Sequence, residues 1–164
     1  MRRWKIHLTI ESKALGLSAK FIRSISEQIL LHVETDITPP AISELHILLT
    51  NDEKMRELNR EFRNKDKTTD VLSFPQFPRD ELRGIATLED PSNTYLGDLV
   101  ISTETTLKQA TKFETSKEDE LLRLITHGIL HLCGYDHENV STSEAQKMRR
   151  KERKIRALIS TTAL

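Results

Sequence analysis

Cysteine is almost absent from this chain of 164 residues, which contains only Cys133. A single thiol cannot form an intramolecular disulfide, and the chain is long enough to bury a core without one, so we expect a reducing, cytoplasmic environment. The N-terminal region has no apolar run of signal-peptide length, and no other stretch approaches the length of a membrane span. The sequence therefore predicts a soluble protein without a membrane partner.

Excess charge of either sign is also lacking, because 25 Lys and Arg residues are matched by 25 Asp and Glu residues. This balance excludes a bulk positive field that would attract a polyanion, so any binding to nucleic acid would need local basic patches. The length fits one domain, and no repeat, low-complexity tract or domain boundary interrupts the pattern. We expect residues 1–164 to form a single domain.

The periodicity of apolar residues predicts an α/β (α+β) fold. Alternation over residues 4–10 is typical of a half-buried strand, and short apolar runs predict three more strands at 45–49, 71–74 and 99–101. Helical spacing and capping residues predict helices that follow Ser18, Thr50, Ser116 and Ser141, with another over 103–113. In the second of these, Met55, Leu58 and Phe62 are expected on the inner face. The order of elements predicts a small mixed four-stranded sheet packed with about five or six helices.

One long segment, from Pro75 to Thr94, has little periodicity and contains three further proline or glycine breaks. Loops of this length are uncommon unless they are functional or mobile. The segment could be a lid or a simple insert, and the absence of a periodic signal slightly favours the insert.

Three histidines lie close together in the segment HGILHLCGYDH, at positions 127, 131 and 137. His127 and His131 are four residues apart on one face of a predicted buried helix, and Gly134 can end that helix and bring His137 back. Three imidazoles leave the fourth position of a tetrahedral ion open, which is typical of catalytic rather than structural zinc. We predict one Zn²⁺ ion on His127, His131 and His137.

The same spacing occurs in the metalloprotease pattern H-E-x-x-H-x-x-G-x-x-H, whose Glu is the general base. Gly128 occupies the position of that Glu, so the metal-binding half of the pattern is present and the peptide-cleaving half is missing. Cys133 falls on a different helix face from His131 and is expected to be a small buried hydrophobe. The pattern indicates a metal-dependent hydrolase that is not an ordinary zinc protease.

Two carboxylates near the histidines are further candidates. Asp136 could orient a ligand imidazole or accept a proton from bound water, or it could simply stabilise the turn after Gly134. Glu120 precedes His127 by seven residues, although a first-turn carboxylate favoured by the helix dipole explains it better. The other histidines, at positions 7, 32 and 46, have no such neighbours in the sequence, and no role is assigned to them; His7 is expected to face water.

Basic residues occur in two regions. The run from Asn59 to Asp70 mixes both charges and on its own indicates a solvated surface. Positive charge predominates in the last predicted helix, where Glu152 is surrounded by Lys147, Arg149, Arg150, Lys151, Arg153, Lys154 and Arg156. Such a face can bind phosphates or can be a solvated exterior.

With these residues in view, the chain resembles the YbeY family of bacterial rRNA-maturation endoribonucleases. The resemblance rests on Asn59–Arg63 with Asp66-Lys67, on Thr69–Pro75, on Leu96–Ile101 and above all on His127–His137. It implies a zinc ion on the three histidines and cleavage of single-stranded RNA in 16S rRNA 3′-end maturation and ribosome quality control. It also implies the small ribosomal subunit and assembly factors, including an Era-type GTPase, as partners. The segment from Pro75 to Thr94 is longer than is usual in the family.

The resemblance singles out an arginine that matches Arg63, which replaces the surface interpretation of that residue. Zinc held by neutral imidazoles can lower the pKa of bound water to about 7, so hydroxide forms without a strong side-chain base. Gly128 then leaves no carboxylate to repel an anionic phosphate. We expect Arg63 and His127 to act in catalysis, with Asp136 as a weaker candidate.

Two alternatives remain open from the sequence. A zinc peptidase or amidase would need a Glu from elsewhere in the chain, and a non-catalytic ribosome assembly factor would carry only a structural zinc. The open ligand position argues against the second alternative. Aromatic residues make up only 5% of the chain, so extensive stacking on bases is not expected.

Overall fold

Four strands form one mixed sheet in the computed structural model, which describes residues 4–33, 44–78 and 95–161. The strands are β1 (Lys5–Ile10), β2 (Glu44–Thr50), β3 (Val71–Pro75) and β4 (Tyr95–Ser102), and their order across the sheet is β1-β2-β4-β3. The first two pairs are parallel, and β3 runs antiparallel to β4. The predicted fold class, one α/β domain with a mixed four-stranded sheet, is confirmed.

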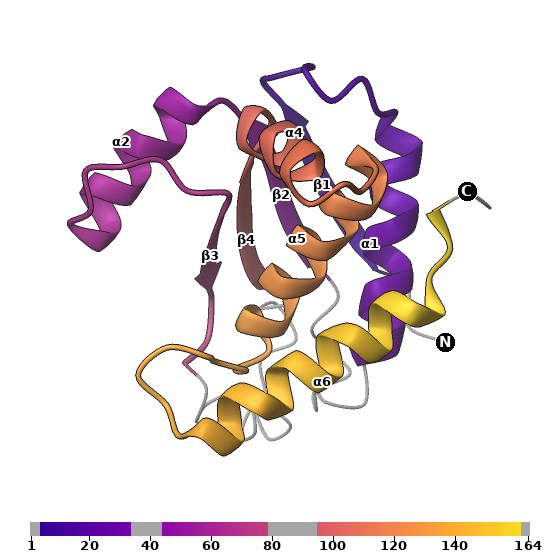
Figure 1. The fold of residues 1–164 in the computed structure, drawn as a ribbon, viewed down its shortest axis with the longest axis vertical. Helices are drawn as coiled ribbons and strands as arrows, with labels where there is room; N and C mark the ends of the chain where they lie inside the picture. Colours follow the sequence, from indigo (N-terminus) through magenta and orange to yellow (C-terminus); the bar gives the residue numbers. More distant parts are fainter. Residues whose placement is uncertain (1–3, 34–43, 79–94, 162–164) are drawn as a thin grey trace.

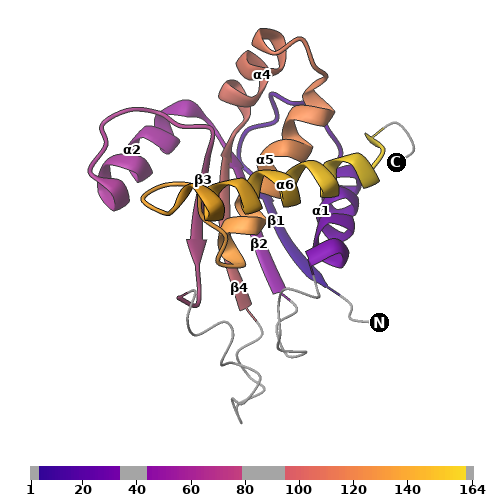
Figure 2. The same cartoon turned by 60° about the horizontal axis from the view of Figure 1, so that its bottom comes forward.

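Five helices surround the sheet within the described residues. They are α1 (Ala19–Val33), α2 (Asp52–Arg63), α4 (Thr103–Lys112), α5 (Lys117–Leu132) and α6 (Thr142–Leu158). Figure 1 shows α1, α5 and α6 over one face of the sheet, with α2 beside β3. In both views α6 crosses over α5, which brings the last helix to the segment that carries the histidines (Figure 2). Among the described residues, no helix combines the length and apolar character that crossing a membrane requires.

The two faces of the sheet differ in their covering. Side chains alternate along each strand, so Leu45, Ile47 and Leu49 of β2 all point into the main core beneath α1 and α5. On the opposite face, a smaller cluster joins Leu72 and Val100 of the sheet to Met55 of α2. The helix α5 is apolar around most of its circumference, as predicted, because it is packed between the sheet and three other helices.

Details of α2 differ from the prediction. Its N-cap is Asn51, whose side chain accepts a hydrogen bond from the backbone N–H of Lys54, whereas Thr50 is the buried last residue of β2. Phe62 does face the sheet, since its ring meets that of Phe74 of β3 edge to face at 5.2 Å, but it remains 58% exposed. The buried contact of α2 with the sheet is made through Met55, whereas Phe62 packs on β3, the edge strand (Figure 1).

The long segment from Pro75 to Thr94 lies mostly outside the described residues. Its first residues are described: Pro75 ends β3, and Phe77 is buried in the main core. The choice between a lid and an insert stays a prediction.

Gly97 in β4 allows a close approach between the last two strands. Its φ is 149°, and a Cβ atom there would lie 2.5 Å from the carbonyl oxygen of Phe74 and 3.1 Å from the Cα of Pro75. We expect Gly97→Ala to lower the free energy of unfolding by about 3 kcal/mol, because backbone atoms must move. Urea denaturation measures this loss. Gly16→Ala is the matched control, since Gly16 also has a positive φ but a Cβ there would meet only Lys117 Nζ at 3.5 Å; an equal loss in both variants would contradict the role of close approach.

Candidate metal centre

The three histidines of the HGILHLCGYDH segment converge on one point. Ser116 caps the N-terminus of α5, the helix ends at Leu132, and Gly134 adopts a left-handed φ of 88° that turns the chain back. One ring nitrogen from each histidine lies within 4.8 Å of the other two. The Nε2 atoms of His127 and His131 are 3.1 Å apart, close to the separation of about 3.3 Å between two nitrogens of a tetrahedral zinc ion. The donor set therefore fits such an ion.

His131 is suited to metal binding because it is neutral. Burial, with the adjoining His127 and His137, lowers the pKa of its imidazole to about 4. Near pH 7 the ring therefore keeps a lone pair available for a metal ion, and no proton has to be displaced from it.

Glu152 on α6 supports the first of these histidines. Its carboxylate lies 3.1 Å from Nδ1 of His127 and accepts a hydrogen bond from it when that nitrogen carries the proton. This arrangement leaves Nε2 of His127 facing the other two rings, and it is the usual way in which a carboxylate fixes a ligand imidazole. Burial tends to raise the pKa of Glu152, but His127, Arg156 and Arg123 outweigh it, so the carboxyl is held ionised. Sequence reasoning missed this role, although Glu152 stands out as a single acid within a run of basic residues.

We expect Glu152→Gln to weaken zinc binding at the three-histidine centre by about 10- to 100-fold, because the amide no longer holds His127 in one tautomer. Competition with a zinc-binding dye measures the affinity. Glu144→Gln on the same helix is the control, since Glu144 lies in the first turn of α6 and pairs with Lys147. Unchanged zinc affinity in Glu152→Gln would show that the contact is only structural.

The histidines open onto a cavity of about 770 Å³ that Arg63 also lines. Arg63 is the last residue of α2, and Asn64 ends the helix in a left-handed conformation with its N–H bonded to the carbonyl of Asn59. The guanidinium makes an ion pair of 3.2 Å with Glu138, the residue after the third histidine. Other residues on the wall include Asp70, Ser73, Phe74, Arg123, Tyr135 and Asp136.

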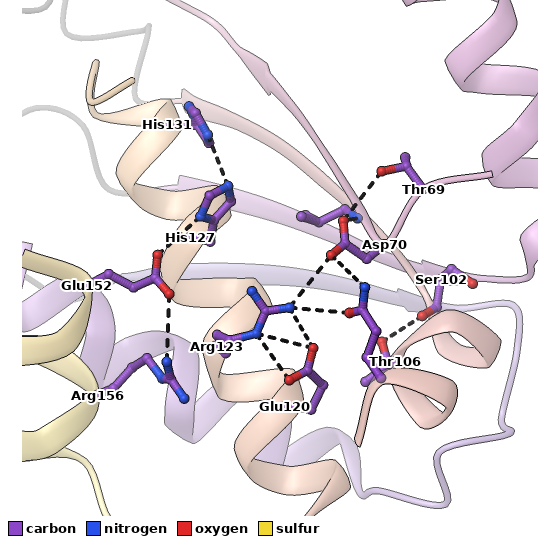
Figure 3. A network of polar contacts seen from close by, with 12 residues as sticks. Thr69, Asp70, Ser102, Thr106, Glu120, Arg123, His127, His131, Glu152 and Arg156 are labelled. Carbon is purple, nitrogen blue, oxygen red and sulfur yellow. Dashed lines mark hydrogen bonds and ion pairs between the residues drawn. The ribbon is translucent and has the colours of Figure 1, made fainter. Parts of the chain in front are cut away.

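A second arginine on the cavity wall is neutralised by its neighbours, as Figure 3 shows. Arg123 donates three hydrogen bonds of 2.6 to 3.2 Å to the buried carboxylate of Glu120 and lies 3.7 Å from Asp70. Asp70 in turn accepts a hydrogen bond from Gln109. Glu120, the weaker sequence candidate, thus anchors Arg123 rather than orienting His127.

Comparison with known proteins gives consistent results. A family model described as Endoribonuclease YbeY matches residues 7–160. The chain belongs to the YbeY family. The protein named endoribonuclease YbeY from Persephonella marina is 43% identical over 142 residues, which cover 84% of this chain and 82% of that protein. Its namesake from Bartonella quintana is 38% identical over 151 residues, covering 92% and 89%.

The fold also has a match among solved structures. The solution structure of TM1509 from Thermotoga maritima matches with a TM-score of 0.60 and 28% sequence identity, and the match covers 93% of this chain and 87% of that one. The match covers most of both chains, so the arrangement of sheet and helices is a fold that this solved structure shares.

In this YbeY-family chain, Gly128 has a packing role that its place in the motif did not reveal. A Cβ atom at this position would lie 2.6 Å from Cδ2 of the buried Leu99 and 3.3 Å from Oγ of Ser73. A side chain at position 128 would therefore point into the contact between α5 and the sheet. The tight packing of α5 accounts for the glycine independently of any charge repulsion at the phosphate.

The two remaining candidates near the motif are explained by local structure. Oδ1 of Asp136 accepts hydrogen bonds from the backbone N–H groups of His137 and Glu138, at 2.7 and 3.0 Å. Burial tends to raise the pKa of this carboxyl, but these two N–H groups outweigh it and lower the pKa, so Asp136 is an ionised turn residue. Cys133 is half-buried against the main core and is not one of the three clustered ligands.

His7 and His46, which have no clustered histidines near them in the sequence, are neighbours in the structure. They face each other on paired strands, with ring centroids 4.4 Å apart. Their separation of 39 positions in the sequence hid this contact, which only the pairing of β1 with β2 creates.

Proposed function

We propose that this chain is a zinc-dependent endoribonuclease that cleaves single-stranded RNA in 16S rRNA 3′-end maturation and ribosome quality control. One observation carries the proposal: a metal-binding trio of histidines and the guanidinium of Arg63 line the same cavity. Relatives named endoribonuclease YbeY support RNA as the substrate.

The residues of the site have two roles, metal binding and stabilisation of negative charge on the phosphate. His127, His131 and His137 would hold the ion, and Glu152 would orient the first of them. When bound, Zn²⁺ supplies a Lewis acid that polarises a phosphoryl oxygen and lowers the pKa of water to about 7. Arg63 offers a planar, permanently charged fork that matches two phosphate oxygens.

Arg63 is a better phosphate ligand than Arg123 because of its partners. Arg123 is already paired with Glu120 and lies near Asp70, whereas Arg63 contacts Glu138, whose side chain is 54% exposed. A solvent-exposed ion pair is worth at most about 1 kcal/mol. A substrate phosphate can therefore displace Glu138 from Arg63 at little cost.

Two further surfaces could contact a single strand of RNA. The rings of Phe62 and Phe74 meet edge to face at 5.2 Å, and both line the cavity wall, where an exposed base could stack. Exposed Arg149, Arg150 and Arg153 of α6 surround a separate hollow of about 490 Å³ and could bind the RNA backbone with strong salt dependence.

Because the net charge is zero, the protein has no bulk positive field that would attract RNA by itself. We infer that the small ribosomal subunit and assembly factors, such as an Era-type GTPase in the cytoplasm, deliver the substrate.

Removal of the metal tests the proposal. We expect the zinc-loaded protein to cleave a single-stranded RNA and to leave duplex RNA and a peptide intact, and we expect dialysis against a chelator to abolish cleavage until zinc is restored. Labelled substrates on denaturing gels give the rates. Undiminished cleavage by metal-free protein would overturn the mechanism. Peptide cleavage without RNA cleavage would favour a peptidase, and bound zinc with neither activity would favour a structural role for the metal.

A further inference from the structure

A second group of metal-ligating side chains lies on the other face of the sheet, away from α1 and α5. His7 of β1 and both Glu44 and His46 of β2 each offer one ligand atom, and these three atoms lie within 4.8 Å of one another. Nε2 of His7 is 2.7 Å from Oε2 of Glu44. The three side chains are partly exposed, so an ion from solvent can reach them.

The strand pairing explains why these residues meet. The parallel register places His7 directly opposite His46, and Glu44 is two residues before His46 and hence on the same face. The neighbouring Ile6, Leu45 and Ile47 point into the main core on the opposite face. Each ligand is therefore attached to backbone that the sheet already fixes.

A neighbouring strand supplies a carboxylate for the second histidine. Asp98 of β4 is paired with His46, and its Oδ1 lies 3.6 Å from Nδ1 of that ring. Tyr95 is hydrogen-bonded to Asp98, and its ring lies 4.6 Å from the His46 ring. A small rotation would let Asp98 accept a hydrogen bond from Nδ1–H of His46, and such a carboxylate beside a ligand imidazole is a common feature of metal centres.

We propose that His7, Glu44 and His46 form a second binding site for a divalent transition-metal ion, with Asp98 as the carboxylate that orients His46. Two imidazoles and one carboxylate suit Zn²⁺ and its first-row neighbours and leave coordination positions open to water or to a partner. The short contact between His7 and Glu44 would widen as the ion enters between them, which exposed side chains permit. An ion held here links β1 to β2.

This site is independent of the three-histidine centre. The sheet separates the two, because His46 points away from the core residues on which α5 packs. The groove beside the second site, of about 450 Å³, is lined by His7, His46 and Asp98 and shares only Phe62 and Phe74, among the described residues, with the wall of the three-histidine cavity; none of the ligands of either site is shared. The inference therefore does not rest on the proposed nuclease function.

Zinc stoichiometry tests the proposal directly. Equilibrium dialysis of the full chain against micromolar Zn²⁺, followed by elemental analysis, is expected to give two ions per wild-type chain. His46→Gln, Glu44→Gln and His131→Ala should each reduce the number to one, and the double variant His46→Gln with His131→Ala should reduce it to none. His32→Gln is the matched control and should retain two, because His32 is an exposed histidine at the end of α1.

One ion in the wild type, or two ions in His46→Gln, would overturn the second site. These variants replace partly exposed side chains, and circular dichroism with a thermal melt checks that they remain folded. A zinc-dependent rise in the melting temperature of His131→Ala that disappears in the double variant would be a second supporting result. RNA cleavage is not part of this measurement, so failure of the second site and failure of the nuclease proposal are distinguishable.

Discussion

His131→Ala is expected to abolish zinc binding at the three-histidine centre and to reduce RNA cleavage to the rate of the metal-free protein. His131 is one of the three converging histidines: its Nε2 lies 3.1 Å from that of His127, and its ring centroid lies 5.0 Å from that of His137. Loss of a direct ligand should cost more than the roughly 10- to 100-fold in affinity that loss of a supporting carboxylate costs. Zinc content and single-turnover cleavage of a labelled RNA measure the two effects.

The measurement is best made in a His46→Gln background, so that zinc at the proposed second site does not enter the count. His32→Ala is the control for loss of an imidazole elsewhere on the surface. Wild-type cleavage by a folded His131→Ala protein that no longer holds zinc would contradict the proposed use of the metal.

Arg63→Ala is expected to retain zinc and to lower kcat by about 100- to 1000-fold, the range found when one preorganised donor to a transition-state charge is removed. Zinc should be retained because Arg63 belongs to α2 and its ion pair is with Glu138 rather than with one of the three histidines. Arg63→Lys should recover part of the rate, since a lysine keeps the charge but lacks the planar fork.

Two control variants separate phosphate binding from other roles of Arg63. Glu138→Gln breaks the same ion pair while leaving the guanidinium in place, and we expect it to cleave RNA at or above the wild-type rate. Arg60→Ala removes an exposed cation from α2 that is not among the described residues of the cavity wall, and it should cleave normally. If Glu138→Gln were as slow as Arg63→Ala, the ion pair itself would be the functional element.

Much of the fold could be predicted from local patterns in the sequence. The four strands and the helix that bears His127 and His131 were predictable because apolar periodicity reports directly which side of an element is buried. Phe62 faces Phe74 of β3 as predicted but stays 58% exposed, because periodicity gives a direction around the helix axis and does not say how far neighbouring residues cover the side chain. The N-cap of α2 was one residue off because Thr50 and Asn51 are both good caps.

The candidate site was likewise predictable only in part. His127, His131 and His137 lie within eleven residues, so spacing and one helical turn suffice to bring their nitrogens together. Glu152 and Arg63 reach the site from other segments, and no local rule specifies such contacts. The resemblance to the YbeY family singled out Arg63, but it did not identify Glu152.

The sequence by itself determined the three-histidine ligand set, the mixed sheet and the absence of a carboxylate at position 128. The tertiary structure decided that Gly128 serves the packing of α5 on Leu99, that α6 supplies a partner for His127, and that His7 meets His46. The physical reason is the separation along the sequence. Helical periodicity and turns relate residues that are a few positions apart, whereas strand pairing and helix crossing join residues that are 25 or more positions apart.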